Sequence, residues 1–281
     1  PDVTTNLVFY GGGKGIGTFY WENNEGLKRA AEIFAAPSAD AARELMEAAG
    51  VTHVVIYSWG GFEKEYLQLH ADFLADGPAS DSPFLMQLVR DQKIPRWLRP
   101  LAFQPPRELT AQGDVALIFE KVEEMTEGLA AARRFEYLLE MGLNAAALAM
   151  APALARFEAS EPAVAISRAR ALALSGNRED FRSLVNEITG AAARWEDLAL
   201  EDRIRLSGVF AIAGMRDEAA AQLERAISEL DESALGALTV DAIMHLFDLS
   251  RSLGTTLPNA EFAAAAKARL PNRLKERFDA L

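Results

Sequence analysis

The residues best suited to chemistry begin with a glycine-rich stretch near the start of the chain. Gly11 to Gly17 follows an apolar run, and backbone N–H groups in such loops can bind a phosphate group. The spacing fits neither the P-loop pattern nor the dinucleotide fingerprint G-x-G-x-x-G, because Ile16 occupies the third position counted from Gly11 and Gly13. We therefore favour a glycine-rich turn between strands. The alternative is an enzyme that binds a phosphorylated or nucleotide-sugar ligand through Gly13 and Gly15.

The second candidate is a polar and aromatic cluster that follows directly. It consists of Tyr20, Trp21, Glu22, Asn23 and Asn24. Aromatic rings can stack on the C–H face of a sugar, while amide and carboxylate groups bind its hydroxyls. In the competing interpretation the rings belong to the hydrophobic core and an asparagine caps the next helix. The cluster thus predicts either a glycan-binding site or a helix start.

Other ionisable groups give weaker indications. A pair among Glu63, Glu65, Asp72 and Asp76 could serve glycoside chemistry, but acidic residues at these spacings are more typical of a solvated helix face. His53 alternates with core positions of a strand, which favours a structural hydrogen bond over a catalytic base. We expect no catalytic residue, no metal site and no cofactor.

A short basic run surrounds Trp97. It could meet lipid headgroups or an acidic partner, although a solvated linker is the simpler interpretation in so acidic a chain. The run consists of Arg90, Lys93, Arg96 and Arg99.

The composition is that of a folded protein of one large or two ordinary domains. The chain has 281 residues, half of them hydrophobic and a quarter charged, with a net charge of −12. This charge repels phosphate backbones, so we expect no nucleic-acid partner. Cysteine is absent, which excludes disulfides and thiolate chemistry. No apolar stretch reaches the roughly 20 residues that span a bilayer, and the start at Pro1 without an initiator Met suggests a piece of a longer protein.

The front of the chain predicts a small α/β domain over residues 1–122, with a mixed or parallel sheet and flanking helices. Its central feature is the β-branched run from Val51 to Ser58, which predicts a buried central strand. Ser38 caps the preceding helix and Gly50 ends it. Further strands are expected at 6–10, 18–21 and 115–119, and helices at 27–35, 62–74 and 84–89. The proline-dense segments 94–100 and 104–106 are expected to be extended and outside any helix.

The rest of the chain, residues 123–281, predicts an all-α domain. Alanine and leucine dominate, and glycines recur at Gly142, Gly176, Gly214 and Gly254, with spacings of 34, 38 and 40 residues. Periods of this length are typical of helix pairs stacked in a solenoid. The tetratricopeptide (TPR) consensus is only partly met, so we expect a TPR-like helical-repeat domain, with an irregular helical bundle as the alternative.

Several short segments of the front domain resemble a known family. They are Tyr20-Trp-Glu-Asn23, Glu25-Gly-Leu27, a helix ending at Phe34, Ala41–Arg43, Gly50–Ile56 and Pro95–Leu101. Together they are similar to the tail that follows the last membrane helix in bacterial polytopic membrane proteins of the glycosyltransferase-like class, which use lipid-linked sugars. The resemblance covers residues 7–121. The catalytic acid of that family lies between membrane helices, so no catalytic residue carries over.

The resemblance implies a non-catalytic, soluble domain at the periplasmic or extracytoplasmic face of the inner membrane, with a cytoplasmic location left open. We expect a protein partner at the helical repeats, or a glycan, and attachment to a membrane only through a segment outside this sequence. A solenoid that serves purely as an interaction scaffold is a further alternative.

Overall fold

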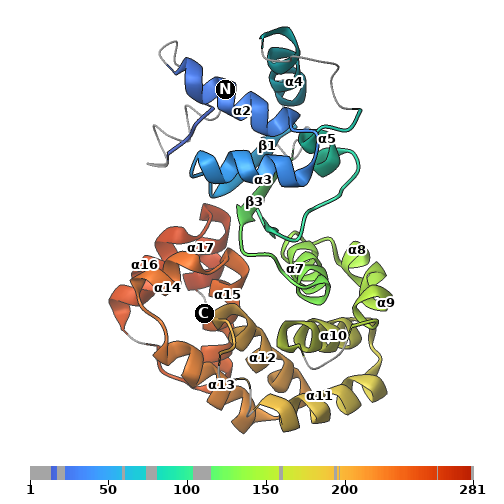
Figure 1. The fold of residues 1–281 in the computed structure, drawn as a ribbon. Helices are drawn as coiled ribbons and strands as arrows, with labels where there is room; N and C mark the ends of the chain where they lie inside the picture. Colours follow the sequence, from blue (N-terminus) through green and yellow to red (C-terminus); the bar gives the residue numbers. More distant parts are fainter. Residues whose placement is uncertain are drawn as a thin grey trace. The chain divides into compact units, whose positions relative to one another are not determined.

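The computed structural model describes residues 14–17, 23–58, 61–73, 81–103, 115–157, 161–192, 195, 197–257 and 259–279. The chain divides into two compact units, Pro1–Met125 and Thr126–Leu281. The border expected from composition falls after residue 122. Each unit is described by itself (Figure 1).

The first unit combines helices with short strands. Its described elements are α2 (Asn24–Ala35), α3 (Ala39–Ala48), β1 (His53–Tyr57), α4 (Phe62–Phe73), α5 (Phe84–Val89), β2 (Leu98–Leu101) and β3 (Ala116–Lys121). The Ser38 hydroxyl accepts the Ala41 N–H at 3.2 Å and so caps α3 as predicted. Gly50, with φ +64°, turns the chain from α3 toward β1 in a conformation that favours glycine.

The three described strands form an antiparallel sheet in the order β1-β3-β2. His53 pairs with Glu120 and Leu98 pairs with Lys121. The prediction of a mixed or parallel sheet is therefore wrong for these strands, and β3 rather than β1 lies between the other two. A hydrophobic run does not determine whether a strand pairs in a parallel or an antiparallel way. Strand β2 comes from the proline-dense segment, which was expected to be extended. Pro100 is accommodated because β2 is an edge strand of the described sheet, where a residue without an N–H is tolerated.

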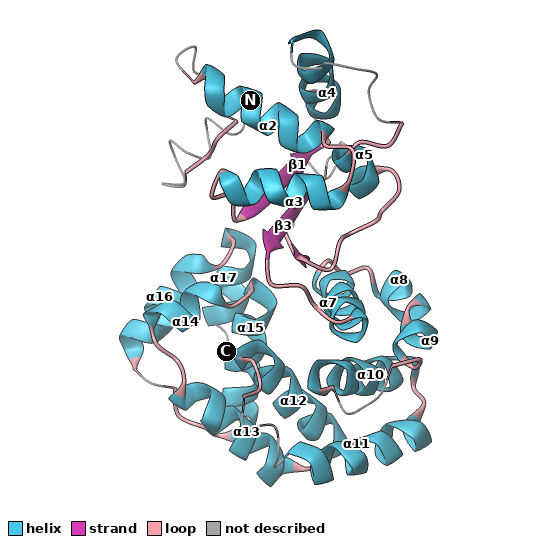
Figure 2. Cartoon of the chain, viewed as in Figure 1, coloured by secondary structure: helices cyan, strands magenta, loops and turns pink. Residues whose placement is uncertain are grey.

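One hydrophobic core joins the sheet to its helices. Phe84 and Leu85 of α5, Met46 of α3 and Leu98 of β2 are all fully buried. The Phe84 ring stacks on Trp97 with 5.9 Å between centroids. Figure 2 shows α2 and α3 beside the strands. This packing fixes the position of β1 relative to α2, which matters for the site below.

The described part of the second unit is entirely helical, as the sequence predicts. Its helices are α7 (Glu127–Glu140), α8 (Asn144–Ala149), α9 (Ala151–Leu154), α10 (Pro162–Ser175), α11 (Arg178–Ala192), α12 (Leu200–Ala213), α13 (Arg216–Ser228), α14 (Glu232–Ala237), α15 (Val240–Leu253), α16 (Ala260–Arg269) and α17 (Asn272–Asp279). No helix in the described part of the chain is long and apolar enough to cross a membrane.

Four helices of this unit have the same length and the same kind of ending. α7, α10, α12 and α15 each contain 14 residues. A glycine with positive φ follows each of them, at the four positions that the sequence singles out: Gly142, Gly176, Gly214 and Gly254. Consecutive members of the set contact each other. In Figure 1, α8, α9, α11 and α13 lie outside this inner row.

Candidate functional site

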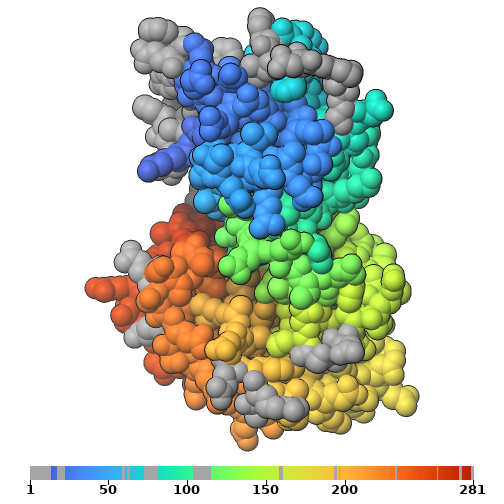
Figure 3. Space-filling model, in the orientation of Figure 1, coloured from blue at the N-terminus to red at the C-terminus, as the bar shows by residue number. Residues whose placement is uncertain are grey.

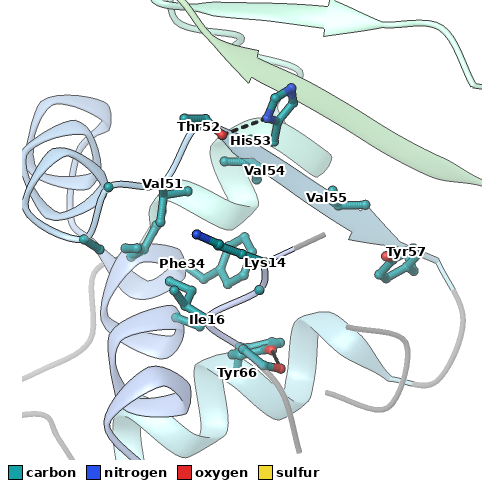
Figure 4. Close-up of a pocket in the computed structure, with 16 residues that line it drawn as sticks. Lys14, Ile16, Phe34, Val51, Thr52, His53, Val54, Val55, Tyr57 and Tyr66 are labelled. Carbon is teal, nitrogen blue, oxygen red and sulfur yellow. Dashed lines mark hydrogen bonds between the residues drawn. The ribbon is translucent and has the colours of Figure 1, made fainter. Parts of the chain in front are cut away.

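A pocket of about 730 Å³ lies in the first unit, lined by the loop 14–17, helices α2 and α4, and strand β1 with the turn before it (Figure 4). Its volume is in the range of small-molecule sites, roughly 300 to 1,000 Å³. Most of the lining is apolar: Ile16, Ala30, Ile33, Phe34, Val51, Val54, Val55, Tyr57 and Tyr66. An apolar ligand would therefore remove aliphatic and aromatic surface from water on both sides of the contact.

Helix α2 and the turn before β1 provide the rigid walls. Ala30, Ile33 and Phe34 lie three and four residues apart on the buried face of α2. The Val51 N–H donates to the Met46 carbonyl at 2.8 Å, which fixes the turn from α3 into β1. These walls depend on the hydrophobic core of the unit.

The loop is held in place by close contacts of its backbone. The Tyr66 hydroxyl donates to the Gly17 carbonyl at 3.2 Å, and the Asn23 amide donates to the Ile16 carbonyl at 2.8 Å. A Cβ at Gly17 would lie 2.5 Å from the Tyr66 hydroxyl, and one at Gly26 would lie 2.3 Å from the Ile16 carbonyl. A side chain at Gly26 would therefore push the loop away from α2, and one at Gly17 would displace the Tyr66 hydroxyl that holds the loop against α4.

Lys14 brings positive charge to this pocket. Its side chain is exposed, and Figure 4 shows it extending across the pocket. His53 is also exposed and shares a 3.0 Å hydrogen bond with the Thr52 hydroxyl. Burial raises the pKa of Tyr57 to about 12, so its phenol stays neutral at physiological pH. The pocket thus combines a large apolar surface with a cationic side chain.

The structure describes only some of the residues that were predicted to bind a ligand. Gly13, Tyr20, Trp21 and Glu22 lie outside the described residues. Gly15 lines the pocket. Asn23 occupies the N-cap position of α2, but its side chain makes no capping bond and instead holds the loop at Ile16.

The last of these residues, Asn24, is the exposed first residue of α2 and does not line the pocket. Sequence reasoning missed Phe34, Tyr66 and the valines of β1, which look like ordinary core residues. Two features of the sequence could have indicated the pocket: the apolar run Val51–Tyr57 and the glycine-rich loop that contains Lys14.

The other ionisable candidates behave as surface residues. Glu65 and Asp72 are exposed on α4, and Asp72 accepts a hydrogen bond from Gln68 at 2.6 Å. The Glu63 side chain and Asp76 lie outside the described part. No group of three or more metal-binding side chains is found among the residues described.

The basic run around Trp97 is largely neutralised by neighbouring acids. Arg96 pairs with Glu124 at 2.6 Å, and Arg99 pairs with Glu120 at 2.7 Å across β2 and β3. Trp97 itself is buried. The segment predicted to be a solvated linker therefore includes strand β2, which pairs with β3. The prolines of this segment argued against a strand.

Comparison with known proteins gives no match to a family model, a curated protein or a solved structure. The case for function therefore depends on the pocket and on the chemistry of its lining.

Proposed function

We propose that the chain is a non-catalytic binding domain at the extracytoplasmic face of a membrane, part of a glycosyltransferase-like protein. In this proposal the α/β unit binds an apolar ligand that carries an anionic group. The observation that supports it most is the pocket itself, in which Lys14 extends across a lining of aliphatic and aromatic residues.

Two interactions would contribute to binding: burial of the apolar part of the ligand and pairing of its anionic group with Lys14. Each methylene buried against the apolar lining contributes about 0.8 kcal/mol. An exposed lysine contributes only about 1 kcal/mol or less when it pairs with an anion, because water screens the interaction. The apolar part should therefore dominate affinity, while Lys14 selects for ligands with an anionic end.

The segments that resemble the glycosyltransferase-like family also build the pocket. The helix ending at Phe34 and the run Gly50–Ile56 supply most of its walls. Lipid-linked sugars, the substrates of that family, join an apolar chain to a sugar through phosphate. This chemistry suits an apolar pocket with a lysine, and it supports a role in holding a lipid phosphate rather than in transforming it.

Replacing Lys14 by glutamine should weaken binding of farnesyl phosphate about fivefold, the effect of losing roughly 1 kcal/mol of ion pairing. Binding of farnesol, which lacks the phosphate, should not change. Isothermal titration of the full chain with both compounds and with inorganic phosphate measures this difference. The matched control is Lys28→Gln, because Lys28 is exposed on α2 and does not line the pocket.

Three outcomes would count against this proposal. Failure of the wild-type chain to bind either prenyl compound would remove the ligand class. An equal effect of Lys28→Gln would show a general loss of charge rather than a site. Tighter binding of a nucleotide sugar than of farnesyl phosphate would favour the alternative of an enzyme that uses the glycine-rich loop.

We also propose that the second unit is a TPR-like array that binds a protein partner. The equal lengths of α7, α10, α12 and α15, and the glycine after each, support a repeated helix pair. Leu174 and Ile212 are 49% and 63% exposed, each two residues before its glycine, so the pairs present equivalent apolar side chains. In an experimental structure, the helix pair α10–α11 should superpose on the pair α12–α13. Clearly different crossing angles in the two pairs would instead indicate an irregular helical bundle.

A further inference from the structure

Strand β1 lies at an edge of the described sheet, and its outer edge runs along the pocket. Among the described residues β1 pairs with β3 alone, in the strand order β1-β3-β2. The pocket is lined by His53, Val54 and Val55, although successive side chains of a strand point to opposite faces of the sheet. A cavity that meets both kinds of side chain follows the edge of the strand rather than one face. In Figure 4, β3 lies on one side of β1, and Ile16 and Phe34 lie on the other.

The register of β1 determines which of its backbone groups point to this outer edge. The Thr52 carbonyl accepts the Lys121 N–H of β3 at 2.7 Å, and the Ser58 N–H donates to the residue just before β3. In an antiparallel strand, successive residues point their N–H and C=O groups alternately to one side and to the other. The backbone groups of His53 and Val55 therefore point away from β3. No residue in the described part of the chain bonds to them on that side.

The other edge of the described sheet is closed to a further strand. The Val122 N–H donates to the Trp97 carbonyl at 2.9 Å, so by the same alternation Leu98 and Pro100 of β2 point outward. The Leu98 N–H is bonded to the Pro95 carbonyl at 3.0 Å, and Pro100 has no N–H to donate. Prolines of this kind keep an edge strand from pairing with another chain. Strand β1 contains neither proline nor lysine, so of the two described edges it is the one open to pairing.

An open strand edge inside an apolar pocket favours a ligand that carries amide groups. A purely apolar chain along β1 would bury the N–H and C=O groups of His53 and Val55 without partners, which is unfavourable. An extended peptide supplies the missing bonds, because every second residue offers one N–H and one C=O to the edge. Its apolar side chains would meet Ile16, Ile33 and Phe34, which come from the loop and from α2.

The charge of the pocket indicates which part of a peptide it would hold. Among the described residues of its lining, Lys14 is the only lysine or arginine, and none is an aspartate or a glutamate. The Lys14 side chain is exposed and extends across the pocket (Figure 4). A free C-terminal carboxylate matches this charge, so the pocket is suited to the end of a chain.

A second copy of this chain fits the edge less well than a single peptide does. The outer edge of β1 faces the loop 14–17 and α2, which form the opposite wall of the pocket. Pairing β1 with β1 of another copy would bring two such walls against each other, whereas one extended chain enters between the wall and the strand. The five residues of β1 span about 17 Å, so a peptide of about five residues covers the edge.

We propose that the pocket also binds the C-terminal segment of a protein partner, as an added strand beside β1. The segment has apolar side chains at alternate positions, and its carboxylate pairs with Lys14. This inference goes beyond the lipid phosphate of the proposed function, because it assigns a second class of ligand to the same pocket. The peptide and the lipid phosphate therefore exclude each other.

Titration calorimetry of the full chain with synthetic peptides tests the added strand. The parent peptide is acetyl-Gln-Val-Thr-Val-Thr-Val with a free C-terminus. Two further forms carry N-methyl groups, one on its first two valines and the other on its two threonines. Only every second amide bonds to β1, so one form should bind at least about tenfold more weakly, and the other within about threefold of the parent.

The C-terminal amide of the same peptide tests the role of Lys14. It should bind the wild-type chain about fivefold more weakly than the free acid does, because it cannot pair with the lysine. In Lys14→Gln the acid and the amide should bind equally. The matched control is Lys28→Gln, which should keep the fivefold difference, because Lys28 is exposed on α2 and does not line the pocket.

Residue-resolved amide exchange by NMR locates the added strand. With saturating peptide, the amides of His53 and Val55 should exchange at least about tenfold more slowly, because they gain hydrogen bonds. The amides of Val54 and Ile56 point toward β3 by the register, so their exchange should change less than about threefold. This alternation distinguishes a paired strand from a ligand that only covers the surface.

Three results would overturn the proposal: no binding of the parent peptide, equal binding of the two N-methylated forms, or slow exchange of His53 and Val55 in the peptide-free chain. Dimers with the same two amides protected would make a second copy the occupant instead. None of these measurements uses farnesyl phosphate, so the added strand and the lipid phosphate can fail separately. If both ligands bind, farnesyl phosphate should displace the peptide, and simultaneous binding would contradict a shared pocket.

Discussion

Replacing Arg205 by methionine should destabilise the second unit by about 3 to 5 kcal/mol, the usual cost of removing one partner of a buried ion pair. Arg205 is 4% exposed and forms a buried cluster with four carboxylates, those of Glu136, Glu140, Glu201 and Asp202. Its loss leaves negative charges buried in a medium that screens them poorly. Methionine preserves most of the volume, so the effect reports charge rather than a cavity.

Urea unfolding followed by circular dichroism at 222 nm measures this effect. Arg225→Met is the matched control: Arg225 is exposed on α13 and should change stability by less than about 0.5 kcal/mol. Burial raises the pKa of Glu140 to about 7, so this carboxyl is neutral at pH 5.5 and the difference between the two variants should shrink there. A loss below 1 kcal/mol at pH 8 would show that the cluster does not stabilise the unit as described.

Replacing Phe84 by alanine should destabilise the first unit by about 3 to 5 kcal/mol, the range for a large aromatic residue removed from a packed core. Phe84 has no exposed surface and stacks on Trp97. Its N–H donates to the Ala36 carbonyl at 2.8 Å, so α5 is anchored to the end of α2 at the same point. The variant should therefore loosen the walls of the pocket as well as the core.

Chemical denaturation gives the total loss, and hydrogen exchange in β1 and β3 assigns it to the first unit. Phe103 is 42% exposed, and Phe103→Ala should cost less than about 1 kcal/mol. If Phe84→Ala and Phe103→Ala lower stability equally, the packing around α5 is not as described.

Local features of the fold could be predicted from the sequence because neighbouring residues determine them. Ser38 caps α3, Gly50 turns the chain toward β1, and Gly176 follows its helix in the left-handed conformation. Strand β2 could not be predicted, because Pro100 cannot donate a backbone hydrogen bond to a neighbouring strand. A proline is compatible with a strand only at an edge of the sheet, which the sequence does not reveal. Strand direction depends on connections that composition does not encode.

The candidate site was predictable only in part, for a similar reason. Its lining comes from a loop, two helices and a strand that are separated by up to 52 residues, from Lys14 to Tyr66. Phe34 and Tyr66 have the periodicity of core residues, and nothing local distinguishes a residue that faces a cavity. The ion pairs of Arg205 are still less visible in the sequence, because they join positions far apart in the chain, such as Arg205 and Glu140. Figure 3 shows one face of the molecule with all side chains of the described residues in place.

The central claim is that the apolar pocket of the first unit holds a lipid-like anion, and methyl NMR of the full chain tests it most directly. With unlabelled farnesyl phosphate and labelled isoleucine and valine methyls, we expect nuclear Overhauser effects from the prenyl chain to Ile33, Val54 and Val55. Methyl groups of the second unit, such as Ile212, should show none. Binding accompanied by contacts only outside these pocket methyls, or no binding at all, would contradict the account.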